Sequence, residues 1–403
     1  MPDQALSDVK VVDLSHYIAG PFCTKMLADF GAEVIKIEKP GEGDGARRIG
    51  PFPQDIPHPE KSGLFLHLNT NKKGITLNLK TKAGVRLFKE LVREADILVE
   101  SFAPRVMPSL GLSYEELEKI NPRLVMTSVS NFGQTSPYRD YKLTEIVSYA
   151  MGGAMYATGL PDREPLKLGG AVGMYQAGHM AATATIFALY GAEVRGSGEH
   201  LDVSIMDTQA AGQDRRTTMF ISYQYTGEVN VRRATGSAVA TGVRPCKDGY
   251  VNIAGGGVRF TKTLQMMGMP ELLEDSRFAT PEERAKPGRS DEFDEYYLPW
   301  LLERSMRDVW RISQEAHLLS GPIYTSKDVL EDPHFRERDF WAEIDHSEAG
   351  KLTYTGAPFR MSETPWQLRS PAPLLGQHNS EIYCGRLGLS KEDLVKLREM
   401  RVI

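Results

Sequence analysis

Residues 10–37, KVVDLSHYIAGPFCTKMLADFGAEVIKI, contain two short β-branched segments separated by a helical pattern. Residues 10–14 and 34–37 predict buried strands, whereas apolar side chains recur at helical spacing between residues 21 and 30. Pro21 suits the first turn of such a helix, because the N–H group that proline lacks would have no partner there. A strand, a helix and a second strand in this order predict a β-α-β unit with parallel strands.

The same alternation continues as far as residue 129. Further strands are predicted at residues 75–79, 97–99 and 124–129, with a helix at residues 85–94 between the first two. We therefore expect an α/β fold with a Rossmann-like, doubly wound parallel sheet. Such sheets bind ligands at the carboxyl ends of their strands.

The pattern changes after residue 153. Residues 176–194 predict a long, mostly apolar helix, and residues 200–205 predict a further strand. Residues 216–340 differ in composition and contain helical segments rich in Glu, Asp and Arg, and residues 391–400 form a short amphipathic helix. This change in composition predicts a second, smaller domain.

The composition bounds the function. The 403 residues carry a net charge of −5 with no large basic block, which argues against nucleic acid as a partner. Cys23, Cys246 and Cys384 are far apart and form no CxxC pair, so we expect neither disulfides nor a cysteine-bound metal. Neither a signal peptide nor an uninterrupted apolar run of about 18 residues is visible. We expect a cytoplasmic protein with no metal and no membrane partner.

Local patterns indicate an anionic ligand without defining a reaction. Residues 19–21, Ala-Gly-Pro, follow the first strand and could turn backbone N–H groups toward a phosphate, although a plain tight turn explains them equally well. The glycine-rich residues 41–44 lie beside Lys39, Arg47 and Arg48, an arrangement found at phosphate sites and in solvated loops alike. His16 is the best placed of nine histidines to act in catalysis.

A set of motifs, in order from residue 8 to the C-terminal region, closely resembles the class III CoA-transferases. This family includes formyl-CoA transferase, carnitine CoA-transferase and α-methylacyl-CoA racemase. The motifs are VVDL at 11–14, AGP at 19–21, GAEVIKIE at 31–38, NKK at 71–73, ADILVESF at 95–102, NPRL at 121–124, GQ at 133–134, GEHLDVS at 198–204, GAPF at 356–359 and APLLGQH at 372–378.

The resemblance implies a particular architecture. Residues 1–215 and 345–403 would form a large Rossmann-like, CoA-binding domain, and residues 216–344 a small inserted α+β domain with its linkers. Two open-ring subunits would then interlock like links of a chain, with coenzyme A lying across the large domain and the active site at the subunit interface.

The resemblance also assigns CoA contacts, residue by residue. They fall on Ile18, Ala19, Lys39, Leu77, Asn78, Leu79, Lys80, Ser101, Phe102, Ala103, Arg105, Lys142 and Glu145. Ile18 replaces an active-site glutamine of formyl-CoA transferase, and Ser109 replaces an arginine, for which the resemblance offers Arg105 as the substitute. Lys39 and Lys80 suit phosphate groups, although a solvated surface lysine is the competing interpretation of each.

The family nucleophile is missing from this chain. In relatives an aspartate attacks the acyl-CoA thioester to form a mixed anhydride, then becomes an aspartyl-CoA thioester that the acceptor carboxylate attacks. The matching segment here, residues 169–178, reads GGAVGMYQAG and puts Met174 at that position. A thioether cannot form an acyl anhydride. The racemase branch also needs an upstream histidine, where this chain has Thr144, so we expect no catalytic residue.

Three hypotheses follow from this loss. The first is an aspartate-less subunit paired with a homologous subunit that keeps the aspartate, as in the two-subunit benzylsuccinate CoA-transferase of anaerobic toluene degradation. That enzyme moves CoA from succinyl-CoA to (R)-benzylsuccinate. The second is a stand-alone CoA-ester binding protein without transferase activity. The third is an active homodimer that uses other chemistry, through Glu145 or His16.

Overall fold

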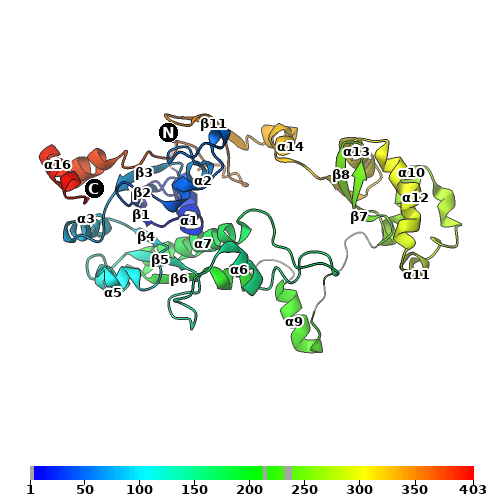
Figure 1. Ribbon diagram of the computed structural model, residues 1–403, viewed down its shortest axis with the longest axis horizontal. Helices are drawn as coiled ribbons and strands as arrows, with labels where there is room; N and C mark the ends of the chain where they lie inside the picture. The colour runs from blue at the N-terminus through cyan, green and yellow to red at the C-terminus, as the bar shows by residue number, and fades with distance from the viewer. Residues whose placement is uncertain (1–3, 212–215, 230–231, 233–237) are drawn as a thin grey trace. The chain divides into compact units, whose positions relative to one another are not determined.

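The computed structural model describes residues 4–211, 216–229, 232 and 238–403 (Figure 1). The chain forms two compact units. The first contains Met1–Tyr156, Lys167–Val229 and Glu337–Ile403, and the second contains Ala157–Leu166 and Asn230–Arg336. The first unit is thus built from both ends of the chain, with limits that differ somewhat from those expected from the sequence. The assignment of CoA binding to the large domain stays a prediction.

The first unit is organised around a six-stranded, fully parallel sheet with the strand order β3-β2-β1-β4-β5-β6. The strands are β1 (Lys10–Leu14), β2 (Glu33–Glu38), β3 (Lys72–Thr76), β4 (Ile97–Glu100), β5 (Val125–Ser130) and β6 (His200–Ser204). Val11 of β1 pairs with Val34 on one side and Ile97 on the other. The strand order reverses between β1 and β4, which confirms the doubly wound α/β class; sheets of this class bind ligands beside such a reversal.

Helices cover both faces of this sheet. Because side chains alternate along a strand, Val11 and Val12 enter opposite cores. On the Val11 side pack α1 (Ala19–Asp29) and α7 (Val172–Arg195). On the Val12 side pack α3 (Lys82–Arg93), the π-helical turn η5 (Glu381–Arg386) and the C-terminal α16 (Lys391–Glu399). Helix α7 can approach α1 closely because residue 178 is a glycine. A Cβ at this position would lie only 2.6 Å from the carbonyl oxygen of Ala19.

Shorter elements complete the first unit. They are η1 (Gly45–Arg48), η2 (Pro53–Asp55), α2 (Gly63–Leu68), α4 (Val106–Ser109), α5 (Tyr114–Glu118), α6 (Glu145–Met151), α8 (Ile205–Ala210), α9 (Arg216–Thr226) and the antiparallel pair β10 (Trp341–His346) and β11 (Gly350–Thr355). Within the part of the chain that the structure describes, no helix is long and apolar enough to cross a membrane.

The second unit has its own antiparallel sheet and core. Its strands, in the order β7-β8-β9, are β7 (Thr241–Cys246), β8 (Gly249–Ala254) and β9 (Leu319–Pro322). Its helices are η3 (Gly257–Arg259), α10 (Phe260–Met267), η4 (Pro270–Leu273), α11 (Pro281–Arg284), α12 (Arg289–Leu302), α13 (Met306–Glu315) and α14 (Ser326–Glu331), followed by α15 (Pro333–Glu337). Phe260, Phe278 and Phe293 form an aromatic cluster at its centre. A separate small domain is therefore confirmed.

One strand begins earlier than its sequence pattern suggests. The sequence predicts residues 75–79, whereas β3 is Lys72–Thr76. Two lysines open the strand, and a fully buried lysine is not expected from hydropathy. Lys72 is buried because its Nζ donates to Asp13 and to the hydroxyl of Thr24, among other oxygen acceptors. Lys72 therefore occupies a core position although its residue type is charged.

Candidate functional site

The loops after the first four strands lie together at the carboxyl edge of the sheet. The N–H group of Leu77 donates to the carbonyl oxygen of Glu38, 2.8 Å away, which sets residues 77–80 beside Lys39. The N–H group of His16 donates to Ser101 Oγ, also 2.8 Å away. The structure therefore brings the predicted CoA contacts together in two groups, residues 18–19 with 101–103 and Lys39 with 77–80.

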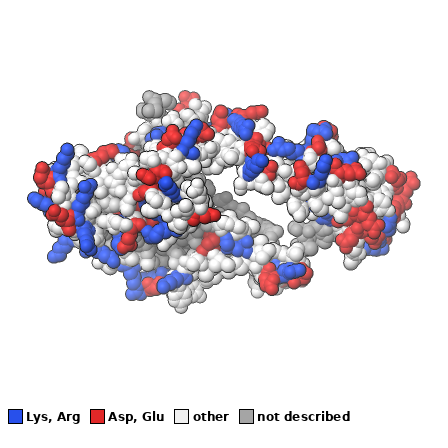
Figure 2. Space-filling view, turned by 45° about the horizontal axis from the view of Figure 1, so that its top comes forward, with Lys and Arg blue, Asp and Glu red and all other residues white. Residues whose placement is uncertain are grey.

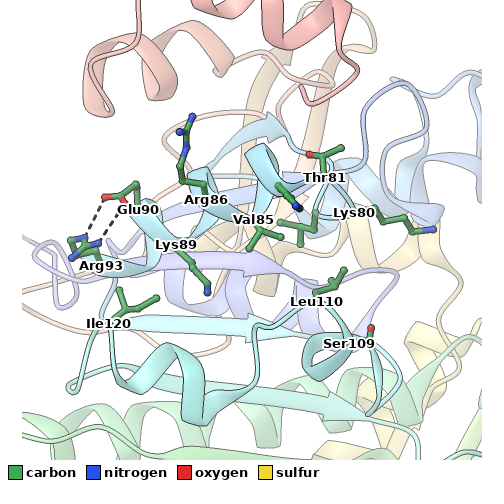
Figure 3. A pocket seen from close by; sticks show the side chains of 12 residues that line it. Lys80, Thr81, Val85, Arg86, Lys89, Glu90, Arg93, Ser109, Leu110 and Ile120 are labelled. Carbon is green, nitrogen blue, oxygen red and sulfur yellow. Dashed lines mark hydrogen bonds and ion pairs between the residues drawn. The ribbon is translucent and has the colours of Figure 1, made fainter.

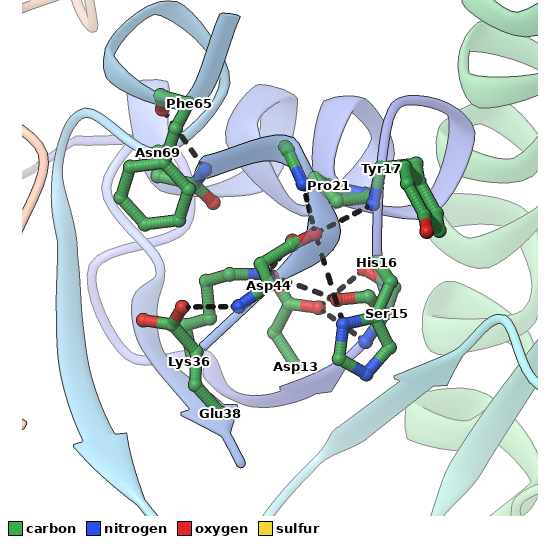
Figure 4. Close-up of polar contacts among 12 residues, drawn as sticks. Asp13, Ser15, His16, Tyr17, Pro21, Lys36, Glu38, Asp44, Phe65 and Asn69 are labelled. Carbon is green, nitrogen blue, oxygen red and sulfur yellow. Dashed lines mark hydrogen bonds and ion pairs between the residues drawn. The ribbon is translucent and has the colours of Figure 1, made fainter. Parts of the chain in front are cut away.

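A buried carboxylate fixes the first of these loops (Figure 4). Asp44 accepts hydrogen bonds from the N–H groups of Tyr17, at 3.0 Å, and Ala46, at 2.9 Å, and pairs with Lys36 Nζ at 2.9 Å. Burial alone would raise the pKa of Asp44, but Lys36 and these hydrogen bonds outweigh it and hold the pKa well below its ordinary value. Asp44 thus stays charged and ties the loop after β1 to the loop after β2.

Tyr17 and Gly45 make this loop tight. Tyr17 adopts a left-handed backbone with φ of 64°, and a Cβ at Gly45 would lie 2.4 Å from the Tyr17 ring. His16 lies beside them, with its Nδ1 3.7 Å from Asp44 Oδ1 and its ring 5.4 Å from that of Phe102. His16 is therefore part of the frame around Ile18 and Ala19. The sequence identified His16 but gave no sign of the buried Asp44 that it faces.

A groove of about 540 Å³ runs along α3 from this edge (Figure 3). Leu79, Lys80 and Ser109 line one part of it. Its other lining residues are Thr81, Lys82, Val85, Arg86, Lys89, Glu90, Arg93, Leu110 and Ile120. An apolar floor with a basic rim can hold a base and its phosphates. The sequence predicted Lys80 but not the further cations of α3, whose helical spacing could have revealed them.

The segment after β4 is held by a buried acid. Glu100 Oε2 accepts the N–H of Phe102 at 2.7 Å. Burial raises the pKa of Glu100 to about 7, although hydrogen bonds from Ser128 and Phe102 oppose the shift. Glu100 was not predicted as a site residue, because a strand-end glutamate has no distinguishing signal in the sequence.

Arg105 is already engaged by another side chain. Its Nε and NH2 donate to the two carboxylate oxygens of Asp140 at 2.8 and 2.6 Å. Ser109, at the position of the family arginine, donates its hydroxyl to the carbonyl oxygen of Val106. One edge of the Arg105 guanidinium is thus occupied by Asp140, a pairing that the sequence did not predict.

The start of α7 carries the residues expected around the family nucleophile. The two carboxylate oxygens of Glu145 accept the N–H groups of Gly173, at 2.9 Å, and Met174, at 3.1 Å. Gln209 Nε2 donates to the carbonyl oxygen of Gly173 at 3.1 Å. Met174 is half-buried, and its side chain packs against the apolar core beneath α1 and α7. Lys142 is exposed. Glu145 therefore caps α7, a role that the sequence did not predict.

An aromatic pocket of about 400 Å³ lies one turn further along α7. Tyr175 and His179 each make edge contacts with the Phe22 ring, at 4.9 and 4.7 Å between centroids. His67 also lines it, and burial followed by the charge of Lys25 lowers the His67 pKa to about 4. The sequence gave no indication of this pocket, because its lining residues come from distant segments.

Among the residues that the structure describes, no cluster of His, Cys, Asp and Glu could hold a metal ion. On the face shown in Figure 2, basic and acidic side chains are interspersed. The candidate site therefore consists of cations at a sheet edge, backbone amides and a capped helix start.

These features are those of a CoA-transferase fold, and the comparisons agree. Residues 6–379 match the model of CoA-transferase family III, so the chain belongs to this family. It is 37% identical to succinyl-CoA–D-citramalate CoA-transferase of Chloroflexus aurantiacus, over 100% of this chain and 99% of that protein. It is 30% identical to the BbsE subunit of succinyl-CoA:(R)-benzylsuccinate CoA-transferase of Thauera aromatica, over 98% of each.

A solved structure agrees in fold. The crystal structure of a CaiB/BaiF family protein from Brucella suis superposes with a TM-score of 0.83 at 30% identity, over 95% of this chain and 99% of that one. The family membership inferred from the motifs is thus confirmed, and the chain is a member of a transferase family whose substrates are CoA thioesters.

Replacing Glu145 by Ala should weaken the start of α7. It removes the acceptor of two helix N–H groups and a negative charge from the positive end of the helix, which costs about 1–2 kcal/mol. Thermal unfolding measures the loss, and hydrogen exchange should become faster at the amides of Gly173 and Met174 in particular. Glu193→Ala, an exposed change in the last turns of the same helix, is the matched control. Unchanged exchange at both amides would contradict the assigned cap.

Replacing Glu100 by Gln should change how stability depends on pH. Because the folded chain holds a proton on Glu100 up to a pKa of about 7, against an ordinary value of 4.5, the wild type loses stability as pH rises through this window. Glu100→Gln removes that dependence, so its stability relative to the wild type should rise between pH 5 and pH 8 by on the order of 1–3 kcal/mol. Urea unfolding at both pH values measures it, and an equal difference at both would contradict the account.

Proposed function

We propose that this chain is the aspartate-less subunit of a heteromeric class III CoA-transferase and supports a homologous subunit that supplies the nucleophile. The single observation that carries the proposal is Met174 at the start of α7. Its amide is held by Glu145, and its side chain packs against the core. The backbone frame of a nucleophile is thus retained while the side chain at its centre is inert.

The chemistry requires a carboxylate at that position. In the family reaction a carboxylate oxygen attacks the thioester carbon and CoA leaves as a thiolate, giving a mixed anhydride. The thiolate then attacks the enzyme's acyl carbon, which releases the first acid and leaves an enzyme thioester. The acceptor carboxylate then attacks this thioester, which releases CoA thiolate and forms a second mixed anhydride. The thiolate attacks the acceptor's acyl carbon, giving the new CoA thioester and freeing the enzyme carboxylate. The Met174 thioether has no oxygen with which to begin this sequence.

For coenzyme A we propose the carboxyl edge of the first unit. Lys39 and Lys80 would contact phosphates, and the groove along α3 supports a place for the nucleotide. The remaining contacts that we propose are Ile18, Ala19, Leu77, Asn78, Leu79, Ser101, Phe102, Ala103, Arg105, Lys142 and Glu145. Arg105 would have to share its guanidinium with Asp140, and Glu145 would act through its hold on the start of α7. No metal takes part in the proposed reaction.

For the substrates we propose transfer from a CoA thioester such as succinyl-CoA to a carboxylic acid such as benzylsuccinate. The names of the two relatives support this class, and one of them is itself a named subunit. The proposed assembly is an interlocked dimer or tetramer with the aspartate-bearing homologue, in the cytoplasm.

Transferase assays on the pure chain and on its complex with the homologous subunit test the proposal. We expect CoA transfer from the complex and none from the pure chain, because only the partner can form the anhydride. Met174→Leu, which keeps the shape and remains inert, should leave the rate of the complex unchanged within about twofold.

Other results would separate the alternatives. If the pure chain transferred CoA as fast as the complex, the proposal would be wrong, and loss of that rate in Glu145→Gln or His16→Gln would identify the third hypothesis. If the chain bound CoA esters, purified without a partner and showed no transfer in any combination, it would be the stand-alone binding protein.

A further inference from the structure

Three exposed cations lie on the segments that follow β2 and β3 at the sheet edge. Lys39 directly follows β2, and Lys80 closes the loop after β3, which the bond from the Leu77 N–H to the Glu38 carbonyl oxygen holds alongside. Arg48 ends the 3-10 turn η1, which the side chain of Asp44 caps. All three cationic side chains are exposed, so they face solvent and whatever binds from it.

The direction of Arg48 is set by its neighbour. Arg47 is fully buried, with its Nε and NH2 each 2.7 Å from a carboxylate oxygen of Glu38, and its guanidinium lies 3.7 Å above the Phe65 ring. With Arg47 turned inward on this short turn, Arg48 is turned outward. Of these two adjacent arginines, Arg47 is thus a buried structural residue, whereas the Arg48 side chain is exposed and can contact a ligand.

The carboxylate of Glu42 lies among these cations. Its Oε1 is 2.6 Å from Lys39 Nζ, and its carbonyl oxygen accepts a bond of 2.7 Å from Arg48 NH1. The hydrogen bond from Lys39 and then the charges of Lys39, Arg48 and Lys80 lower the pKa of Glu42. Of the three cations, Lys39 contacts the carboxylate itself and Arg48 contacts the main chain of the same residue.

The backbone presents Glu42 on a narrow turn. Gly43 donates its N–H to the carbonyl oxygen of Lys39 at 2.9 Å, and Gly41 and Gly43 both have left-handed φ, of 74° and 66°. Around Gly41 there is open space, whereas a Cβ at Gly43 would lie 2.7 Å from Arg47 Cδ. The turn is therefore anchored on the Gly43 side and open on the Gly41 side, where the Glu42 side chain can move away.

We propose that Glu42 is an internal counter-ion that occupies the place of a phosphate between Lys39, Arg48 and Lys80, and that the 3′-phosphate of CoA displaces it on binding. This inference rests on the proposed binding of CoA. Lys39 pairs with the Glu42 carboxylate, Arg48 bonds the carbonyl oxygen of the same residue, and Lys80 lies on the adjoining loop, so the three cations exceed the one carboxylate by two positive charges. A phosphomonoester carries about −1.5 to −2 at neutral pH and accepts from several donors, so it matches that excess better than a carboxylate does.

The competition sets the affinity for the phosphorylated nucleotide. Each CoA molecule that binds must break the pair between Lys39 and Glu42, and Glu42 returns when CoA leaves. The pair is exposed and screened by water, so breaking it costs little free energy and weakens CoA binding only modestly. The return of Glu42 to Lys39 favours release of CoA. A nucleotide that lacks the 3′-phosphate does not enter this cluster and leaves Glu42 in place.

Calorimetric titration of the full chain with CoA and with 3′-dephospho-CoA tests the inference. Glu42→Gln should lower the Kd for CoA by about two- to fivefold, the range expected for an exposed ion pair, and leave the Kd for dephospho-CoA unchanged. Arg48→Ala should weaken CoA binding and spare dephospho-CoA. The matched control is Glu116→Gln, which removes an exposed glutamate paired with Lys119 at the same i,i+3 spacing, away from the groove, and it should change neither Kd.

Each other outcome is decisive. Unchanged or weaker CoA binding by Glu42→Gln would overturn the role of Glu42 while leaving CoA binding intact. Equal tightening of CoA and dephospho-CoA would overturn the assignment of the cluster to the 3′-phosphate. If the wild-type chain and every variant bound no CoA, the proposed CoA site itself would be wrong, and this inference would fail with it.

Discussion

The ion pair between Lys36 and Asp44 is the interaction on which the site depends. Both side chains are fully buried, and Lys36 Nζ also donates to the carbonyl oxygen of Ser15 at 2.9 Å. Asp44 in turn holds the backbone of Tyr17 and Ala46. One buried pair therefore fixes the loops after β1 and β2 relative to each other. Removal of either partner would leave the other charge buried without its ion-pair partner, which is strongly destabilising in a protein interior.

This constraint explains how charged residues are arranged at the sheet edge that we propose as the CoA site. The cations that face solvent, Lys39 and Arg48, lie on loops whose buried neighbours are Glu38 and Arg47. The buried charges of Glu38 and Arg47 neutralise each other, so the exposed cations are not needed to compensate buried carboxylates and can contact a ligand. A chain with a net charge of −5 can in this way offer a local positive site without a basic surface.

The sequence was sufficient to predict the fold class, whereas the site residues stay a prediction. The parallel sheet follows from the alternating strand and helix patterns, whose period depends only on local geometry. The start of β3 was misplaced because Lys72 is buried by long-range pairing with Asp13, which hydropathy cannot detect. Glu145 and Arg105 are predicted site residues, and the partners that the structure shows for them, the Gly173 and Met174 amides and Asp140, come from distant segments. Contacts of this kind depend on the tertiary structure.

The central claim is that Met174 removes the nucleophile while the surrounding frame is kept. Intact-mass spectrometry of both subunits after incubation of the complex with succinyl-CoA, followed by acid quenching, tests it most directly. The account predicts a covalent adduct on the aspartate-bearing partner and an unchanged mass for this chain. An acyl or CoA adduct on this chain, located by peptide mapping to Glu145 or any other residue, would contradict it.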